Sequence, residues 1–193
     1  SWPCCRSCKS AMQFLAQVRL RDAAADLPDR LLLIYMCQGK PGMCDDFSPS
    51  SGGNHAVTVE AQGLRLLEPP SGRKTLLGKI DGVRLRPFRD DLTPDEEEEF
   101  CFAYVRSRNE LDEEEGEKGK DEDAEQPEVL GQVGGTPAWI QADETPECCG
   151  GPMRFVVQLE DSGGGGINFG DAGSGYAFAC SSCGKASFLW QCG

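Results

Sequence analysis

Apolar and polar residues alternate in two stretches near opposite ends of the chain, at 12–20 and 153–159. Such alternation puts one face of a strand against a core and leaves the other face to solvent. Each stretch is followed by an apolar run, at 31–36 and 176–179, whose length and composition suit a buried partner strand. A last apolar segment at 188–191 is interpreted as a closing strand. We therefore expect a mostly β chain of the α+β class, built from short antiparallel strands and few short helices.

One segment between these strands has a helical pattern instead. Thr93 suits an N-cap, the proline after it suits the first helical position, and acidic residues fill the first turn. Phe100 and Tyr104 then fall on one helical face. We expect a short helix over 93–107. Because apolar residues almost vanish after it, a flexible connector is expected over 109–127.

The two ends of the chain repeat one motif of cysteine, methionine, phenylalanine and glutamine at identical intervals. The motif comprises Cys8, Met12, Phe14 and Gln17 in the first copy and Cys149, Met153, Phe155 and Gln158 in the second. In both copies a loop and an apolar strand ending in cysteine follow, at Cys37 and at Cys180. Two blocks in the same order indicate a duplication. We expect a first copy at 1–89, an acidic segment at 90–128 and a second copy at 129–193, with the copies able to pack as one pseudo-symmetric domain.

The chain contains eleven cysteines, and their spacing is typical of metal knuckles. An odd number of closely spaced thiols does not favour a set of disulfides. In the first copy two residues separate Cys5 from Cys8, and Cys37 and Cys44 follow. A tight turn can direct the first pair at one tetrahedral ion, and strand pairing can bring the second pair alongside it. We predict a closed zinc site with these four ligands, in which Cys4 is an alternative to Cys5.

The second copy predicts a less regular site. Cys180 and Cys183 form a knuckle followed by glycine, but the partner pair is the vicinal Cys148 and Cys149. Adjacent residues seldom direct both sulfurs at one ion without strain, and Cys192 offers another ligand if the last strand returns to the site. We expect a second zinc held by Cys148, Cys149, Cys180 and Cys183. The fourth ligand beside Cys149, Cys180 and Cys183 is left open between Cys148 and Cys192.

The net charge of −13 is concentrated in one segment. Residues 90–128 contain 18 acidic and 4 basic side chains, a balance of −14, whereas the rest of the chain contains 14 acidic and 15 basic side chains, a balance of +1. A run of this kind attracts basic proteins and repels phosphate backbones. The simpler interpretation is a solvated and partly disordered connector.

Few residues of the chain have the spacing of catalytic groups. The single histidine, His55, belongs to no zinc deaminase or zincin motif, and we expect it on a surface loop. The glycine-rich stretch at 170–175 precedes a strand rather than a helix, so it predicts a turn and not a phosphate-binding loop. We expect no enzymatic activity and no small-molecule cofactor.

No apolar run in the sequence is long enough to span a bilayer, and the start lacks a signal-peptide core. The chain begins at Ser1 rather than at methionine, so a preceding targeting segment is compatible with the sequence. Clustered thiols suit a reducing compartment. These features predict a cytoplasmic protein that does not enter the membrane.

Several motifs of the two copies together resemble a known family. They are Gly-Gly-Thr-Pro-Ala-Trp-Ile-Gln at 134–141, Pro-Met-Arg-Phe-Val-Val-Gln-Leu at 152–159, Phe-Gly-Asp-Ala-Gly at 169–173 and Tyr-Ala-Phe-Ala-Cys at 176–180, with Trp-Pro-Cys-Cys-Arg-Ser-Cys at 2–8, Met-Gln-Phe-Leu-Ala-Gln at 12–17, Met-Cys-Gln at 36–38, Gly-Met-Cys at 42–44 and Ser-Gly-Gly-Asn at 51–54. With these motifs the chain resembles the YwqG-like proteins of bacteria and the related programmed cell death protein 2 family of eukaryotes. The match does not extend over 60–128.

This resemblance carries expectations about function. It implies a role in ribosome biogenesis, as escort of a ribosomal protein, and RNA-processing roles have been suggested for the superfamily. The bacterial members imply no particular activity. One departure concerns the second copy, where relatives commonly have two residues between the cysteines that are adjacent here as Cys148 and Cys149.

Three functional hypotheses follow. The first is a non-enzymatic module, stabilised by structural zinc, that acts as a chaperone or adaptor for a basic, ribosomal-type protein. The second is an RNA-binding or RNA-processing accessory protein, which would use basic residues between 65 and 89. The acidic run that follows those residues weakens this second hypothesis. The third is a partner protein that neutralises a toxin.

Overall fold

The computed structural model describes residues 1–40, 43–65, 68–70, 82–85, 129–161, 166–170 and 172–193. The helix predicted over 93–107 and the connector predicted over 109–127 lie outside these residues. Within them, the prediction of a mostly β fold with antiparallel sheets is confirmed. The described part of the chain contains one short helix, and no helix there is long and apolar enough to cross a membrane.

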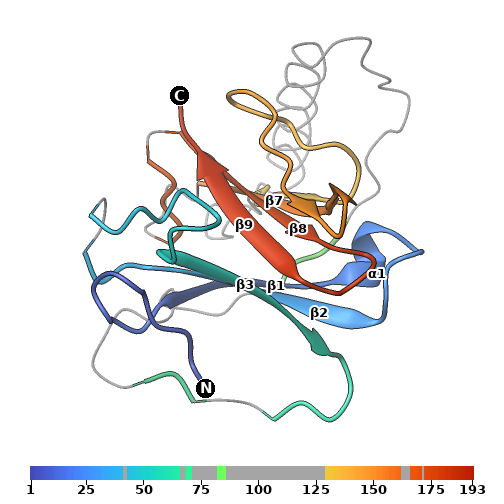
Figure 1. Ribbon diagram of the computed structural model, residues 1–193, viewed down its shortest axis with the longest axis horizontal. Helices are drawn as coiled ribbons and strands as arrows, with labels where there is room; N and C mark the ends of the chain where they lie inside the picture. Colours follow the sequence, from blue (N-terminus) through green and yellow to red (C-terminus); the bar gives the residue numbers. More distant parts are fainter. Residues whose placement is uncertain (41–42, 66–67, 71–81, 86–128, 162–165, 171) are drawn as a thin grey trace, which may run out of the picture.

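The strands form two main sheets and one small hairpin. The first sheet has the order β1 (Gln13–Arg19), β2 (Arg30–Met36), β3 (Asn54–Glu60), and the helix α1 (Leu20–Ala23) follows β1 directly. The second sheet has the order β4 (Gly131–Val133), β7 (Arg154–Glu160), β8 (Ser174–Ala179), β9 (Ala186–Gln191). The hairpin pairs β5 (Glu147–Cys148) with β6 (Gly151–Pro152). Figure 1 shows the second sheet, in orange and red, lying across the first sheet, in blue and teal.

The three strands of the first sheet are repeated by β7, β8 and β9 of the second sheet, and β4 has no counterpart. β1 pairs with β2 as β7 pairs with β8, and both pairings shift register at the same place, between Phe14 and Ala16 and between Phe155 and Val157. The phenylalanine before each irregularity stands opposite an aromatic residue of the next strand, either Tyr35 or Phe178. The duplicated motif therefore corresponds to a duplicated strand geometry.

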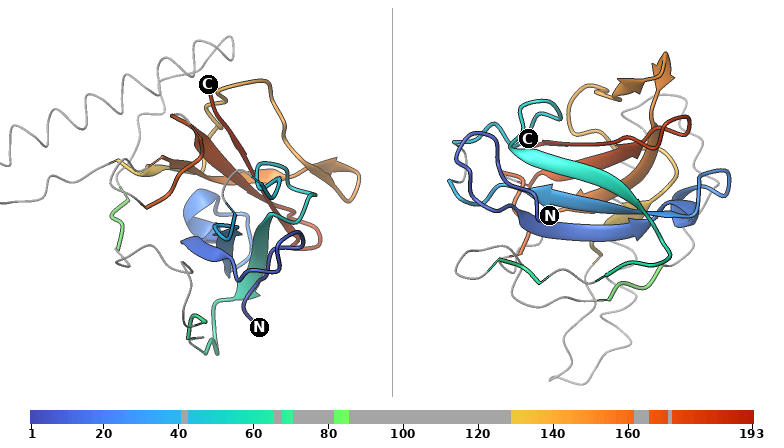
Figure 2. Two further views of the ribbon diagram at one scale, coloured as in Figure 1. Left: turned by 90° about the vertical axis from the view of Figure 1, so that its left-hand side faces the viewer. Right: turned by 60° about the horizontal axis from the view of Figure 1, so that its bottom comes forward.

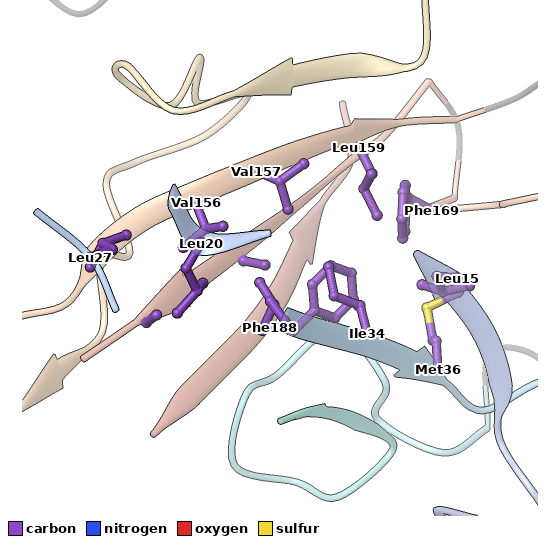
Figure 3. Packing of buried hydrophobic residues seen from close by; sticks show 13 residues of the cluster. Leu15, Leu20, Leu27, Ile34, Met36, Val156, Val157, Leu159, Phe169 and Phe188 are labelled. Carbon is purple, nitrogen blue, oxygen red and sulfur yellow. The ribbon is translucent and has the colours of Figure 1, made fainter. Parts of the chain in front are cut away.

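Residues from both sheets share one core, which Figure 3 shows from close by. The core consists of Leu15, Leu20, Leu27, Leu32, Ile34, Met36, Val156, Val157, Leu159, Phe169, Ala177, Ala179 and Phe188. Phe169 and Phe188 belong to this core, with their ring centroids 5.9 Å apart. A Cβ at Gly175 would lie 2.7 Å from an atom of each ring, so only glycine fits at that position of β8. Neither sheet has this core without the other.

Five elements and one residue differ from the sequence-based expectation. α1 and β3 of the first copy were not predicted, and neither were β4, β5 and β6 of the second copy. β3 lies against the turn between β8 and β9, where the Thr58 hydroxyl donates a hydrogen bond to the Gly184 carbonyl at 2.6 Å. His55, which we expected on a surface loop, is exposed on β3. The loop prediction was wrong because 54–60 pairs with the whole of β2.

Candidate metal centres

The first group of cysteines gathers at one end of the first sheet. Cys5 and Cys8 lie in the turn before β1, Cys37 follows β2 directly, and Cys44 comes from the loop between β2 and β3. Their four sulfur atoms lie within 4.8 Å of one another, and the Sγ atoms of Cys8 and Cys37 are 3.5 Å apart. Four sulfurs at about 2.3 Å from a tetrahedral ion would be about 3.8 Å apart. A disulfide would require about 2.05 Å. The spacing fits a metal ion.

The second group gathers beside the small hairpin and comprises Cys148, Cys149, Cys180 and Cys183, whose sulfurs also lie within 4.8 Å of one another. Cys148 Sγ is 3.5 Å from Cys183 Sγ and 3.8 Å from Cys149 Sγ. Figure 2 shows the hairpin, in orange, beside the red turn between β8 and β9 that carries Cys183. In Figure 1 the hairpin lies to the right, whereas the loops of the first group lie to the left, so the groups occupy opposite ends of the molecule.

The same tight turn supplies two ligands to each group. In the first group the Lys9 N–H donates to the Cys5 carbonyl at 3.0 Å, and Lys9 has a φ of 61°. In the second group the Gly184 N–H donates to the Cys180 carbonyl at 2.9 Å, and Gly184 has a φ of 72°. This turn precedes the first strand of the first copy but separates the last two strands of the second copy. The two copies therefore carry this turn at different places relative to their strands.

The sulfurs of the adjacent Cys148 and Cys149 can belong to one group because a turn begins between the two residues. Cys148 ends β5, and Cys149 and Gly150 form a two-residue loop with φ values of 54° and 82°. Positive φ at both loop residues is the geometry of a type I′ hairpin, which suits the twist of the paired strands. Of the two adjacent cysteines only Cys149 has a positive φ, so the backbone strain expected for adjacent ligands falls on that residue. Cys4 and Cys192, the alternatives that the sequence left open, belong to neither group.

Equivalent aromatic residues pack beside both groups. In the first copy Phe14 contacts Tyr35 edge to face at 5.5 Å and 62°, and Trp2 contacts Tyr35 at 5.5 Å. In the second copy Phe155 contacts Phe178 at 5.7 Å and 63°. Trp139 stacks on Phe178 at 5.9 Å. Each sheet therefore has a second, smaller apolar cluster on the face away from the shared core.

The segment that carries Trp139 is held in place by Gln158, a buried residue of the repeated motif. The Gln158 Oε1 accepts the Ala138 N–H at 2.9 Å, and the Tyr176 hydroxyl donates to the Ala138 carbonyl at 2.8 Å. Gln17, the matching residue of the first copy, is exposed. Gln158 stands opposite Tyr176 on the face away from the shared core, between the inward Val157 and Leu159, so the alternation along the strand gave no sign that it is buried.

Hydrogen bonds favour one thiolate in each group. The Ser10 hydroxyl and then its backbone N–H lower the pKa of Cys8 to about 6. The backbone N–H of Cys183 is the main cause that lowers the pKa of Cys180 to about 6. Burial acts in the opposite direction on Cys37, whose pKa it raises, and on Cys44, whose pKa it raises to about 11. A divalent cation among the sulfurs would supply the charge that favours all four thiolates.

The two groups could each hold a metal ion, and their donor set favours zinc. Four thiolates suit a soft or borderline ion in tetrahedral geometry, and hard cations such as Mg²⁺ prefer oxygen. A site with four protein ligands is closed, whereas catalytic zinc keeps a position for water. His55 is not part of either group. Both groups therefore have the donor set of structural zinc sites.

Comparison with known proteins adds no family to this description: no family model, no curated protein and no solved structure matches the chain.

Proposed function

We propose that this protein is a non-catalytic binding module, held together by two structural zinc ions, that serves a basic protein as chaperone or adaptor. The observation that carries the proposal is the pair of closed four-cysteine groups at opposite ends of one shared core. Each group joins segments that are distant in sequence, such as Cys8 with Cys37 and Cys148 with Cys183. An ion in each place would stabilise the ends of the two sheets rather than act on a substrate.

The choice of a basic client rests on charge. Residues 90–128 have a balance of −14, and the remaining chain is close to neutral at +1. Long-range attraction of this kind accelerates association with an oppositely charged partner and is screened by salt. RNA is a weaker candidate, because a phosphate backbone would be repelled by the same segment. The resemblance to proteins that escort a ribosomal protein points to the same kind of client.

Native mass spectrometry should find two zinc ions on each purified chain, one for each group of four cysteines. A strong chelator should remove both and unfold the chain, because metal binding in such sites is largely folding energy. The Cys4→Ser variant is the matched control, since Cys4 is an exposed cysteine outside both groups. It should retain two ions. A native chain that carries no zinc would contradict the structural part of the proposal.

Affinity capture from a cell lysate should recover basic proteins at about 0.05 M salt and lose most of them at about 0.3 M, where charges are screened over a few ångströms. The control is a variant of equal length in which the acidic residues of 90–128 are changed to the corresponding amides. Its capture should fall several-fold at low salt. Equal capture by the neutral variant would refute the basic-client proposal. Loss of capture after ribonuclease treatment would favour the RNA hypothesis instead.

A further inference from the structure

The two cysteine groups differ in their access to solvent. In the first group Cys5, Cys37 and Cys44 are at most 2% exposed. In the second group Cys149 and Cys183 are exposed, Cys148 is half-buried, and only Cys180 is buried. A reagent in solution can therefore reach sulfur directly in the second group, whereas three of the four sulfurs of the first group are enclosed.

The first group owes its protection to its surroundings. Met12, Tyr35 and the indole of Trp2 pack beside it, and the Trp2 Nε1–H donates to the Met12 carbonyl at 2.7 Å. The loop that carries Cys44 is held against the second sheet, where the Trp190 N–H donates to the Phe47 carbonyl at 3.2 Å. Opening this group would disturb contacts between the two sheets.

The second group is built on small elements. Cys148 and Cys149 belong to a hairpin of two-residue strands, and Cys183 belongs to a tight turn at the end of β8. The Sγ atoms of Cys148 and Cys183 are 3.5 Å apart. Shortening this distance to the roughly 2.05 Å of a disulfide needs a movement of about 1.5 Å. A short hairpin can make that movement without opening the shared core, to which none of these three cysteines belongs.

We propose that the second group is a peroxide-sensitive zinc site. A peroxide joins Cys148 to Cys183 and releases the zinc ion, while the first group keeps its own ion. The inference rests on the proposed function, because it requires zinc in both groups. Its chemistry is an oxidation of cysteine ligands at a defined pair of residues.

The reaction balances with hydrogen peroxide as the oxidant. The exposed Cys183 thiolate attacks one peroxide oxygen, the O–O bond breaks, and hydroxide leaves as Cys183 becomes a sulfenic acid. The Cys148 thiolate then attacks the sulfur of Cys183 and displaces a second hydroxide as the S–S bond forms. Two electrons pass from the two sulfurs to the peroxide. With only Cys149 and Cys180 left as thiolate ligands, the site would no longer hold a zinc ion.

The test treats the zinc-loaded full chain with a small excess of hydrogen peroxide. A colour-forming chelator should record the release of one of the two zinc ions. Differential alkylation and peptide mass spectrometry should place the new disulfide between Cys148 and Cys183, with the enclosed Cys5, Cys37 and Cys44 modified only after denaturation. Addition of dithiothreitol and zinc should restore two ions. The Cys4→Ser variant should behave as the native chain.

A second variant separates the disulfide from the metal site. Cys148→His keeps four zinc ligands, since three cysteines and one histidine form a common structural site, but removes one partner of the disulfide. Its peroxide-driven release of zinc should be at least several-fold slower. Release as fast as in the native chain, simultaneous loss of both ions, or a disulfide at any other pair would overturn this inference alone. Fewer than two zinc ions on the native chain before peroxide is added would overturn the proposed function and, with it, the peroxide-sensitive site.

Discussion

Replacement of Cys37 by serine should remove one of the two zinc ions and unfold most of the chain. Cys37 is completely buried, follows β2 directly and lies 3.5 Å from the sulfur of Cys8. Binding of structural zinc is worth on the order of 10–16 kcal/mol, and whole domains are stable by only about 5–15 kcal/mol. A serine hydroxyl is a poor zinc ligand and would be buried at this site. The free energy lost with the zinc ion is therefore larger than the remaining contacts can offset.

The zinc count from native mass spectrometry and the far-ultraviolet circular dichroism measure the two parts of this expectation. The loss should extend to the second sheet, because residues of both sheets share one core. Cys4→Ser is again the matched control, since it removes an exposed thiol one residue away from a ligand. It should change the free energy of unfolding by less than about 0.5 kcal/mol. A folded Cys37→Ser chain with two zinc ions would show that the first group does not hold metal.

Most strands could be predicted from the sequence because their inward residues are large and apolar. The predicted stretches at 12–20, 31–36 and 153–159 correspond to β1, β2 and β7 within one or two residues at each end. β3 was missed because its inward positions are Ala56 and Thr58, a small and a polar residue that give little periodic signal. α1 was missed because four residues are too few to show a helical period.

The choice among neighbouring cysteines depends on backbone direction, which spacing does not reveal. Cys4 forms a β-bridge with Ala11, and successive residues of extended chain point to opposite sides, so Cys5 faces the site and Cys4 faces solvent. Cys148 and Cys149 escape this alternation because the second residue adopts a positive φ. The sequence could identify the cysteines that were candidates. Only the turn geometry decides which of them meet.

The unequal exposure of the two groups could not be predicted either. Both contain four cysteines, and both include the same two-residue spacing, at Cys5 and Cys8 and at Cys180 and Cys183. The first group is enclosed because its fourth ligand comes from a long loop that packs against the opposite sheet. The second group is open because the equivalent strands, β8 and β9, are joined by a short turn. The length of one connection thus decides which group a reagent can reach.

Replacement of Phe188 by alanine should lower the free energy of unfolding by about 3–5 kcal/mol, the usual cost of removing a buried phenylalanine. Phe188 is 1% exposed in the shared core, and its ring lies against that of Phe169. The space would not refill easily, because the ring of Phe188 packs on Gly175, which has no side chain to move into it. Urea unfolding at a fixed concentration of free zinc measures the change.

The variant separates core packing from metal binding. Phe188 belongs to the shared core and not to the small apolar clusters beside the cysteines, so Phe188→Ala should keep two zinc ions while it is destabilised. Leu64→Ala is the control, because Leu64 is 50% exposed and its loss should cost less than about 0.5 kcal/mol. If Phe188→Ala instead loses zinc in the folded state, the geometry of the cysteine groups depends on the core. Zinc binding would then depend on the packing of the two sheets, and the ions would not stabilise the ends of the sheets independently.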